Sequence, residues 1–227
     1  MDMILMAGLW LEASAWDQVG VELRGLGHNP IPVALPGVDD RSSTATLEDQ
    51  AAAVVAAVDS AENPLVVGHS AACTLAWIAT DRRPDSVAGV ALIGGFAAGD
   101  GETYADFFET VDGVMPFPGW GPFEGPDSDD LDDATKERVA SAAVPVPEGV
   151  SKGTVRLTDE RRYDVPVVVI CPEFSPDDAR GWVEGGEVPE LAAAKSVSYV
   201  DLDSGHWPMF SKPAELARIL DGIAENG

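Results

Sequence analysis

Short apolar runs alternate with segments of helical spacing along this chain of 227 residues. The runs expected to form strands are 3–7, 31–35, the run that begins at Leu65, 87–93, 165–170 and 196–202. Helical patterns cover 16–26, 47–58, 70–82, a segment starting at Ser175, and 213–225. This alternation predicts an α/β fold with a mostly parallel sheet of about six strands and helices on both faces. The length suits a single domain over residues 1–227, with ligands bound at the carboxyl ends of the strands.

Local signals indicate where some of these elements lie and where they begin. Pro30 and Pro32 interrupt the second run, which predicts a strand that is irregular or lies at an edge of the sheet. Thr46 followed by Asp49 resembles the start of a helix. Residues 175–178, Ser-Pro-Asp-Asp, combine an N-cap serine, a first-turn proline and an acidic first turn, so a helix is expected to start there.

The alternation stops between Gly94 and about Asp164. We expect a lid insertion over about 96–163, because a long segment with little regular pattern is more often functional than idle. It holds an acidic stretch at 127–133 and a helical pattern at 134–143. Its aromatic residues are Phe107, Phe108, Phe117, Trp120 and Phe123. The alternative is a surface excursion whose aromatic side chains only pack on the sheet.

A serine stands at the junction between the third run and its helix, in the stretch Leu65 to Cys73. In a nucleophile elbow, G-x-S-x-G, the residues two before and two after the serine must be small. Gly68 and Ala72 occupy these positions around Ser70, which makes Ser70 the candidate nucleophile. The alternative is an N-cap serine, since Ser70 precedes a helix. A serine hydroxyl attacks efficiently only when a base takes its proton and donors receive the oxyanion.

The chain has three histidines, and one of them follows a strand end. His206 comes directly after the last expected strand and is the candidate base for Ser70. His28 lies in a turn between a helix and a strand, where a solvated position is expected. His69 occupies the variable position of the elbow.

The net charge of -25, from 14 basic and 39 acidic residues, argues against nucleic acid and anionic membranes as partners. It indicates either a solvated acidic surface or adaptation to high salt. Cys73 and Cys171 show no disulfide or metal-site pattern and are expected to be reduced thiols. The N-terminus lacks the basic start of a secretion signal, and no run is long enough to span a bilayer. We therefore expect a cytoplasmic protein.

Four motifs, each at an expected strand end, resemble those of the α/β-hydrolase family. They are Ala7-Gly8-Leu9-Trp10, Leu35-Pro36-Gly37, Gly68-His69-Ser70-Ala71-Ala72 and Ser204-Gly205-His206-Trp207-Pro208. The resemblance covers nearly the whole chain apart from the insertion. Within the family the chain is most similar to small bacterial hydrolases related to plant methylesterases and hydroxynitrile lyases.

The resemblance implies a Ser-His-acid catalytic triad and an oxyanion hole. The oxyanion donors would be the backbone N–H groups of Leu9 and Ala71. The resemblance also places His69 beneath the turn or beside the site, and we expect Trp10, His69, Phe96 and Trp207 around the substrate pocket.

Several carboxylates are candidates for the acid of the triad. The position that carries Asp in much of the family is Ser175 here. Glu173 is the nearest carboxylate at that strand end and is our candidate. Asp100, the first carboxylate after the preceding strand, and Asp177 are the alternatives, along with a site that lacks the acid.

The function expected from this set is hydrolysis of a small carboxylic ester or a lactone through an acyl-serine intermediate, with no cofactor and no metal. The partner is a small-molecule substrate, and the protein is a monomer or homodimer. Related scaffolds perform lyase chemistry with the same Ser and His, which leaves a hydroxynitrile-lyase-like reaction open. The missing Asp at 175 and the alanine at 72 also leave open a weakly catalytic ligand-binding receptor with a hydrolase pocket.

Overall fold

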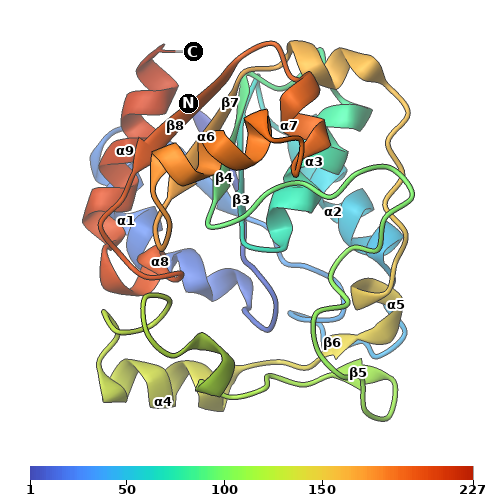
Figure 1. Cartoon of the computed structure of the whole chain (residues 1–227), viewed down its shortest axis with the longest axis vertical. Helices are drawn as coiled ribbons and strands as arrows, with labels where there is room; N and C mark the ends of the chain where they lie inside the picture. The colour runs from blue at the N-terminus through green and yellow to red at the C-terminus, as the bar shows by residue number, and fades with distance from the viewer. Residues whose placement is uncertain (227) are drawn as a thin grey trace.

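The computed structural model describes residues 1–226, and within them six strands form one sheet (Figure 1). The strands are β1 (Asp2–Met6), β2 (Asn29–Pro32), β3 (Leu65–His69), β4 (Gly89–Ile93), β7 (Val167–Cys171) and β8 (Val197–Asp201). Their order is β2-β1-β3-β4-β7-β8, and every neighbouring pair is parallel. The predicted parallel α/β sheet is confirmed.

The edge strand β2 begins two residues before the predicted run of 31–35 and ends at Pro32. The N–H groups of Asn29 and Val33 donate to carbonyls of Met1 and Leu5, on the side of β1. Successive N–H groups of a strand point to opposite sides, so the prolines at 30 and 32 take positions where an N–H would point away from the sheet. The prolines therefore permit a strand, but only at an edge.

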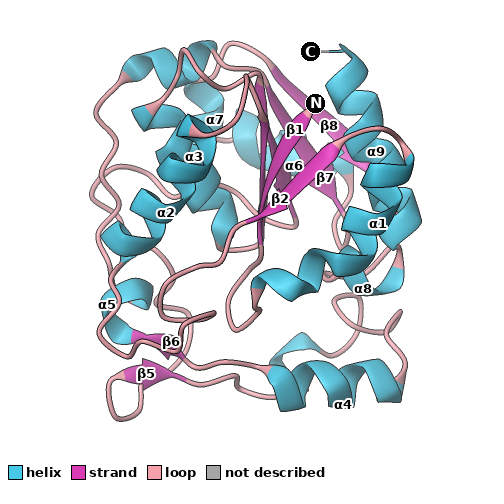
Figure 2. Ribbon diagram, turned by 180° about the vertical axis from the view of Figure 1, so that it is seen from behind, coloured by secondary structure: helices cyan, strands magenta, loops and turns pink. Residues whose placement is uncertain are grey.

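Helices cover both faces of the sheet because alternate strand residues point to opposite faces. In β1, Met3 and Leu5 pack in the cluster that includes residues of α1 (Asp17–Gly25) and α9 (Pro213–Asn226). Ile4 and Met6 pack on the opposite face. The helices there are α2 (Leu47–Asp59), α3 (Ala72–Arg82) and α6 (Pro176–Glu184). Figure 2 shows the two helical layers on either side of the strands.

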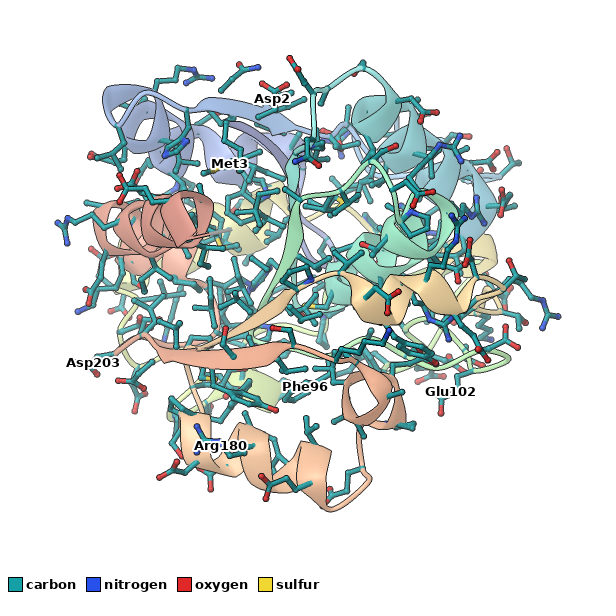
Figure 3. The ribbon with its side chains drawn as sticks, turned by 90° about the horizontal axis from the view of Figure 1, so that it is seen from above. Asp2, Met3, Phe96, Glu102, Arg180 and Asp203 are labelled. Atoms are coloured by element: carbon teal, nitrogen blue, oxygen red, sulfur yellow. The ribbon has the colours of Figure 1, made fainter. Side chains whose placement is uncertain are left out.

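Two predicted helix starts have the expected caps. Thr46 and Asp49 form a reciprocal capping box at the start of α2, and Ser175 and Asp178 form another at α6. In the view of Figure 3, α6 lies along β8, and the guanidinium carbon of Arg180 is 5.3 Å from the ring centroid of Tyr199. The short helices α7 (Pro189–Ala193) and α8 (Pro208–Ser211) were not predicted.

The middle of the chain between β4 and β7, from β5 to α5, lies at the end of the molecule away from the N-terminus (Figure 1). It contains α4 (Asp133–Ala142), α5 (Glu148–Ser151) and a small antiparallel pair, β5 (Val114–Met115) and β6 (Val146–Pro147). α4 matches the predicted helix within one residue at each end. The two-residue strands are too short to show an apolar alternation in the sequence.

A buried ionic cluster anchors the return of this segment to the sheet. Arg162, in a 3-10 turn at Glu160–Asp164, lies 3.2 Å from Asp81 and 2.9 Å from Glu190. Glu190 also accepts a hydrogen bond from the indole of Trp77. Asp81 accepts the backbone N–H groups of residues 158 and 159. These contacts join the end of the insertion to α3 and α7.

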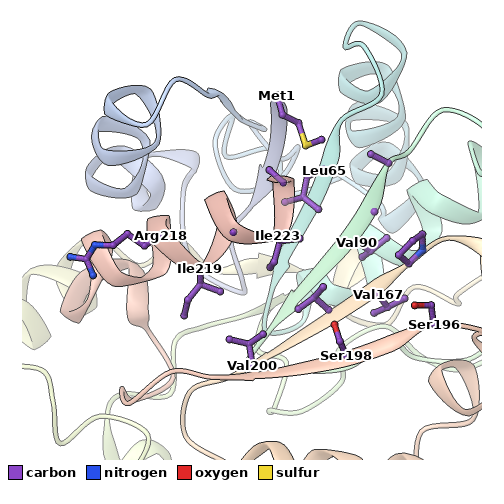
Figure 4. A pocket seen from close by; sticks show the side chains of 16 residues that line it. Met1, Leu65, Val90, Val167, Ser196, Ser198, Val200, Arg218, Ile219 and Ile223 are labelled. Atoms are coloured by element: carbon purple, nitrogen blue, oxygen red, sulfur yellow. The ribbon is translucent and has the colours of Figure 1, made fainter. Parts of the chain in front are cut away.

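A groove of about 480 Å³ lies between α9 and the amino ends of the strands (Figure 4). Ile219 and Ile223 of α9 face Leu65, Val90 and Val167 across it. It is at the end of the sheet opposite to Ser70, because these residues are the first of β3 and β7 and the second of β4. In the described part of the chain, no helix is both long and apolar enough to cross a membrane.

Candidate active site

Ser70 lies in a strained turn between β3 and α3. Its φ of 56° is in the left-handed region, which non-glycine residues rarely adopt. The turn is tight, since a Cβ at residue 68 would lie 2.4 Å from the carbonyl oxygen of Ala72 and one at residue 95 would lie 2.9 Å from that of Ser70. The N-cap residue of α3 is Ala71, and no side chain caps this helix. The N-cap interpretation of Ser70 is therefore wrong.

The His206 ring joins Ser70 to Glu173. Its Nε2 is 2.9 Å from Ser70 Oγ, and its Nδ1 is 2.6 Å from Glu173 Oε1. An ionised carboxylate only accepts, so Nδ1 donates its proton to Glu173 and Nε2 of the neutral ring is left to accept from the serine hydroxyl. This tautomer is the one in which a histidine takes a proton from a serine.

The other acid candidates lie elsewhere. Asp100 accepts the backbone N–H of Leu157, and the exposed Asp177 pairs with Arg180 at 2.7 Å. Ser175 is used as the cap of α6. Of the carboxylates considered from the sequence, the structure brings only Glu173 to His206.

His69 is buried under the elbow and also borders the site. Its Nε2 donates to the backbone carbonyl of His206 at 2.7 Å, and the residue is 1% exposed. Burial, and to a lesser degree the nearby His206, lowers the pKa of His69 to about 3. His69 is therefore neutral at ordinary pH. His28 lies outside the site and pairs with Asp221.

Two backbone N–H groups beside Ser70 have no acceptor among residues 1–226: those of Leu9 and Ala71. The loop after β1 approaches the elbow closely, since a Cβ at Gly8 would lie 3.0 Å from Cβ of Ser70. The predicted oxyanion donors thus lie on the two segments that meet at the serine.

A narrow slot of about 50 Å³ opens at Ser70 and His206. Trp10 and Trp207, both predicted around the pocket, line it together with Leu9, His69, Phe107, Phe108 and Phe123. The ring of Trp10 lies 5.6 Å from that of Phe108 and 6.1 Å from that of Phe123, and its indole N–H donates to the carbonyl of Met115. The insertion therefore closes this side of the site with aromatic rings.

A wider cleft of about 550 Å³ also reaches Ser70 and Ala71. Small residues of the loop after β4 form much of its wall, and Phe96, predicted in the pocket, lies here and not in the slot. Thr74 and Tyr104 supply hydroxyl groups. Phe107 borders both the slot and the cleft.

Two acidic residues of the insertion contact the histidine loop, which the sequence did not reveal. Gly205 donates its N–H to Asp130 Oδ2 at 2.7 Å, and His206 donates its N–H to the carbonyl of Asp127 at 2.8 Å. The only signal in the sequence was the acidic stretch itself.

A parallel sheet that carries a serine on a strained strand-to-helix turn, with a histidine after the last strand, defines the α/β-hydrolase class. The model of the alpha/beta hydrolase family matches residues 3–219, so this chain belongs to that family. Methylesterase 7 of Arabidopsis thaliana is 24% identical over 255 residues, covering 98% of this chain and 95% of that protein.

Solved structures share the fold. An extracellular alpha/beta-hydrolase from a Paenibacillus species superposes with a TM-score of 0.80 at 18% identity, over 97% of each chain. A methylesterase from Arabidopsis superposes with a TM-score of 0.78 at 16% identity, over 100% of each chain.

Proposed function

We propose that this chain is a serine hydrolase that cleaves a small carboxylic ester through an acyl-serine intermediate. The observation that carries the proposal is the continuous hydrogen-bonded path from Ser70 Oγ through both ring nitrogens of His206 to Glu173. The similarity to a methylesterase supports an ester as the substrate.

In the proposed reaction, Ser70 Oγ attacks the ester carbonyl carbon while His206 Nε2 takes the hydroxyl proton. Glu173 stabilises the imidazolium that forms and keeps the ring in the required tautomer. The N–H groups of Leu9 and Ala71 receive the oxyanion. The bond to the alcohol oxygen then breaks, and that oxygen takes the proton from Nε2. A water molecule, activated by the same histidine, attacks the acyl-serine and releases the carboxylic acid.

The shapes of the slot and the cleft favour esters of short alcohols. The leaving oxygen must lie beside His206 Nε2, and His206 lines the slot but not the wide cleft. The slot, at about 50 Å³, holds only a few water-sized groups. We therefore place the alkoxy group in the slot and the acyl group in the cleft. The aromatic rings of the slot favour an alkyl alcohol over a charged one.

The test is a substrate panel of esters, lactones, thioesters and cyanohydrins, run on the wild type and on Ser70→Ala. We expect turnover of short-alcohol esters that Ser70→Ala abolishes, and labelling of Ser70 by a fluorophosphonate. Cyanohydrin cleavage without an acyl adduct would replace the proposal with lyase chemistry. Binding without Ser70-dependent turnover of any panel member would indicate a receptor.

A further inference from the structure

The loop that carries His206 is held by groups far from it in the sequence. Residues 202–207 connect β8 to α8 and contain no helix or strand of their own. The carbonyl of His206 accepts from His69 Nε2, on the side of the elbow. Its N–H donates to the carbonyl of Asp127, on the side of the insertion. The backbone of the base is therefore fixed on two sides, and one of these sides belongs to the insertion.

Asp130 adds a charge-assisted bond next to the base. Its Oδ2 accepts the N–H of Gly205 at 2.7 Å, and bonds to a carboxylate are stronger than those between neutral groups. The contact requires glycine, since a Cβ at 205 would lie 2.4 Å from both the carbonyl oxygen of Asp127 and Oδ1 of Asp130. The two segments are thus in direct backbone contact.

The acceptors sit on a turn with a fixed shape of its own. The N–H groups of Ser128 and Asp129 donate to the carbonyl of Gly125, and the buried hydroxyl of Ser128 donates to the carbonyl of Phe123. Phe123 in turn packs against Trp207, the residue after the base, with ring centroids 5.2 Å apart. The pKa of the Asp127 carboxyl is raised by partial burial and by the negative charge of Glu173, so Asp127 also lies within electrostatic reach of the site.

We propose that Asp130 is a positioning residue for the base: it holds the Gly205–His206 backbone so that the imidazole meets both Ser70 and Glu173. This inference rests on the proposed serine hydrolase function. A displacement of a catalytic group by about 1 Å costs on the order of a hundredfold in rate. Loss of this bond affects turnover rather than substrate binding, because Asp130 lines neither the slot nor the cleft.

The experiment compares Asp130→Ala, Asp130→Asn and the control Asp129→Ala in the full chain. Asp129 is exposed like Asp130, but its side chain makes no hydrogen bond with residues 1–226. On a short-alcohol ester we expect Asp130→Ala to lower kcat at least about tenfold with KM within twofold of the wild type. Asp130→Asn keeps an oxygen acceptor and should recover most of kcat. Asp129→Ala should match the wild type.

A spectroscopic readout separates positioning from the chemistry. The proton between His206 Nδ1 and Glu173 gives a downfield NMR resonance, which Asp130→Ala should broaden or shift and Asp129→Ala should not. If Asp130→Ala does not fold, Asp130→Ser, too short to reach Gly205, takes its place. Equal kcat in Asp130→Ala and Asp129→Ala, with an unchanged resonance, would overturn the proposal. Absence of Ser70-dependent turnover in the wild type would instead refute the hydrolase function, and the resonance would still test the positioning.

Discussion

Gly94 faces the carboxylate of Glu173 so closely that a Cβ at residue 94 would lie 3.3 Å from Oε2 and 3.2 Å from His206 Nδ1. Its φ of +59° is in the left-handed region. A glycine directly after β4 thus leaves room for the contact between Glu173 and His206.

Gly94→Ala should therefore reduce kcat strongly, because the added methyl group pushes the acid and the ring apart. Gly113 is a matched control: its φ is +80°, and nothing lies within 4 Å of a Cβ built there. Both variants should lose about 1 to 2 kcal/mol of stability from the backbone, measured by urea unfolding. Only Gly94→Ala should lose activity; equal kcat in the two would show that the pairing tolerates the methyl group.

Glu173→Gln should lower kcat by about three to four orders of magnitude, through loss of tautomer control. Asp100→Asn is its control, since Asp100 bonds to the backbone N–H of Leu157 and not to His206. Steady-state kinetics on one short ester decides between them. A severe loss in Asp100→Asn with little in Glu173→Gln would reverse the assignment of the acid.

The free energy of unfolding should fall as the pH is lowered from about 6.5, the ordinary pKa of histidine. His69 has a folded pKa of about 3, so the unfolded state binds the extra proton between these two values. The stability associated with neutral His69 is present above the unfolded pKa and is lost toward the folded one. The total loss of unfolding free energy between these two pKa values is on the order of a few kcal/mol.

His69→Gln should flatten this dependence between pH 6.5 and about 4.5, above the range where carboxylates ordinarily titrate. The glutamine amide still donates toward the His206 carbonyl, so the substitution removes the titrating group but keeps this hydrogen bond. Denaturant unfolding over this pH range provides the measurement. The same slope in both proteins would mean that His69 does not carry it.

Substrate selection should follow the slot. The wild type should prefer a methyl ester over the isopropyl ester of the same acid by at least about tenfold in kcat/KM. One carbon more or less in an apolar pocket changes kcat/KM by about 10- to 200-fold. Phe108→Ala should narrow this preference, because Phe108 lines the slot. Phe96→Ala, in the cleft, should alter selectivity for the acid part instead. A preference for long alcohols in the wild type would contradict the placement of the alkoxy group.

Arg162→Met should cost about 3 to 5 kcal/mol, because it leaves the buried Asp81 and Glu190 without their cation. Arg161→Met, one residue earlier, removes only exposed ion pairs with Asp85 and Asp159 and should change stability by less than about 1 kcal/mol. Urea unfolding of the two variants makes the comparison. Equal losses of stability in the two variants would show that the buried ionic cluster has no special role in holding the insertion.

The sequence predicted those parts of the fold and site that depend on local pattern. The strands of the sheet are predicted from short apolar runs, and Ser70 and His206 from their positions after β3 and β8. The parallel topology then brings these strand ends to the same edge of the sheet. The choice between Glu173, Asp100 and Asp177 depends on the paths of two loops in space. The spacing of residues along the sequence does not predict these paths. Asp130 meets Gly205 across 75 positions of the chain, through an insertion whose fold has no periodic signal.

The two prolines of β2 have a consequence for how this protein meets copies of itself. Because Pro30 and Pro32 occupy the outward positions of an edge strand, that rim of the sheet offers a second chain no N–H donors there. Exposed strand edges are the usual templates for intermolecular pairing and amyloid growth, and proline is one of the residues that block them. The two prolines that interrupt the apolar run of β2 thus also protect the sheet from aggregation along this edge.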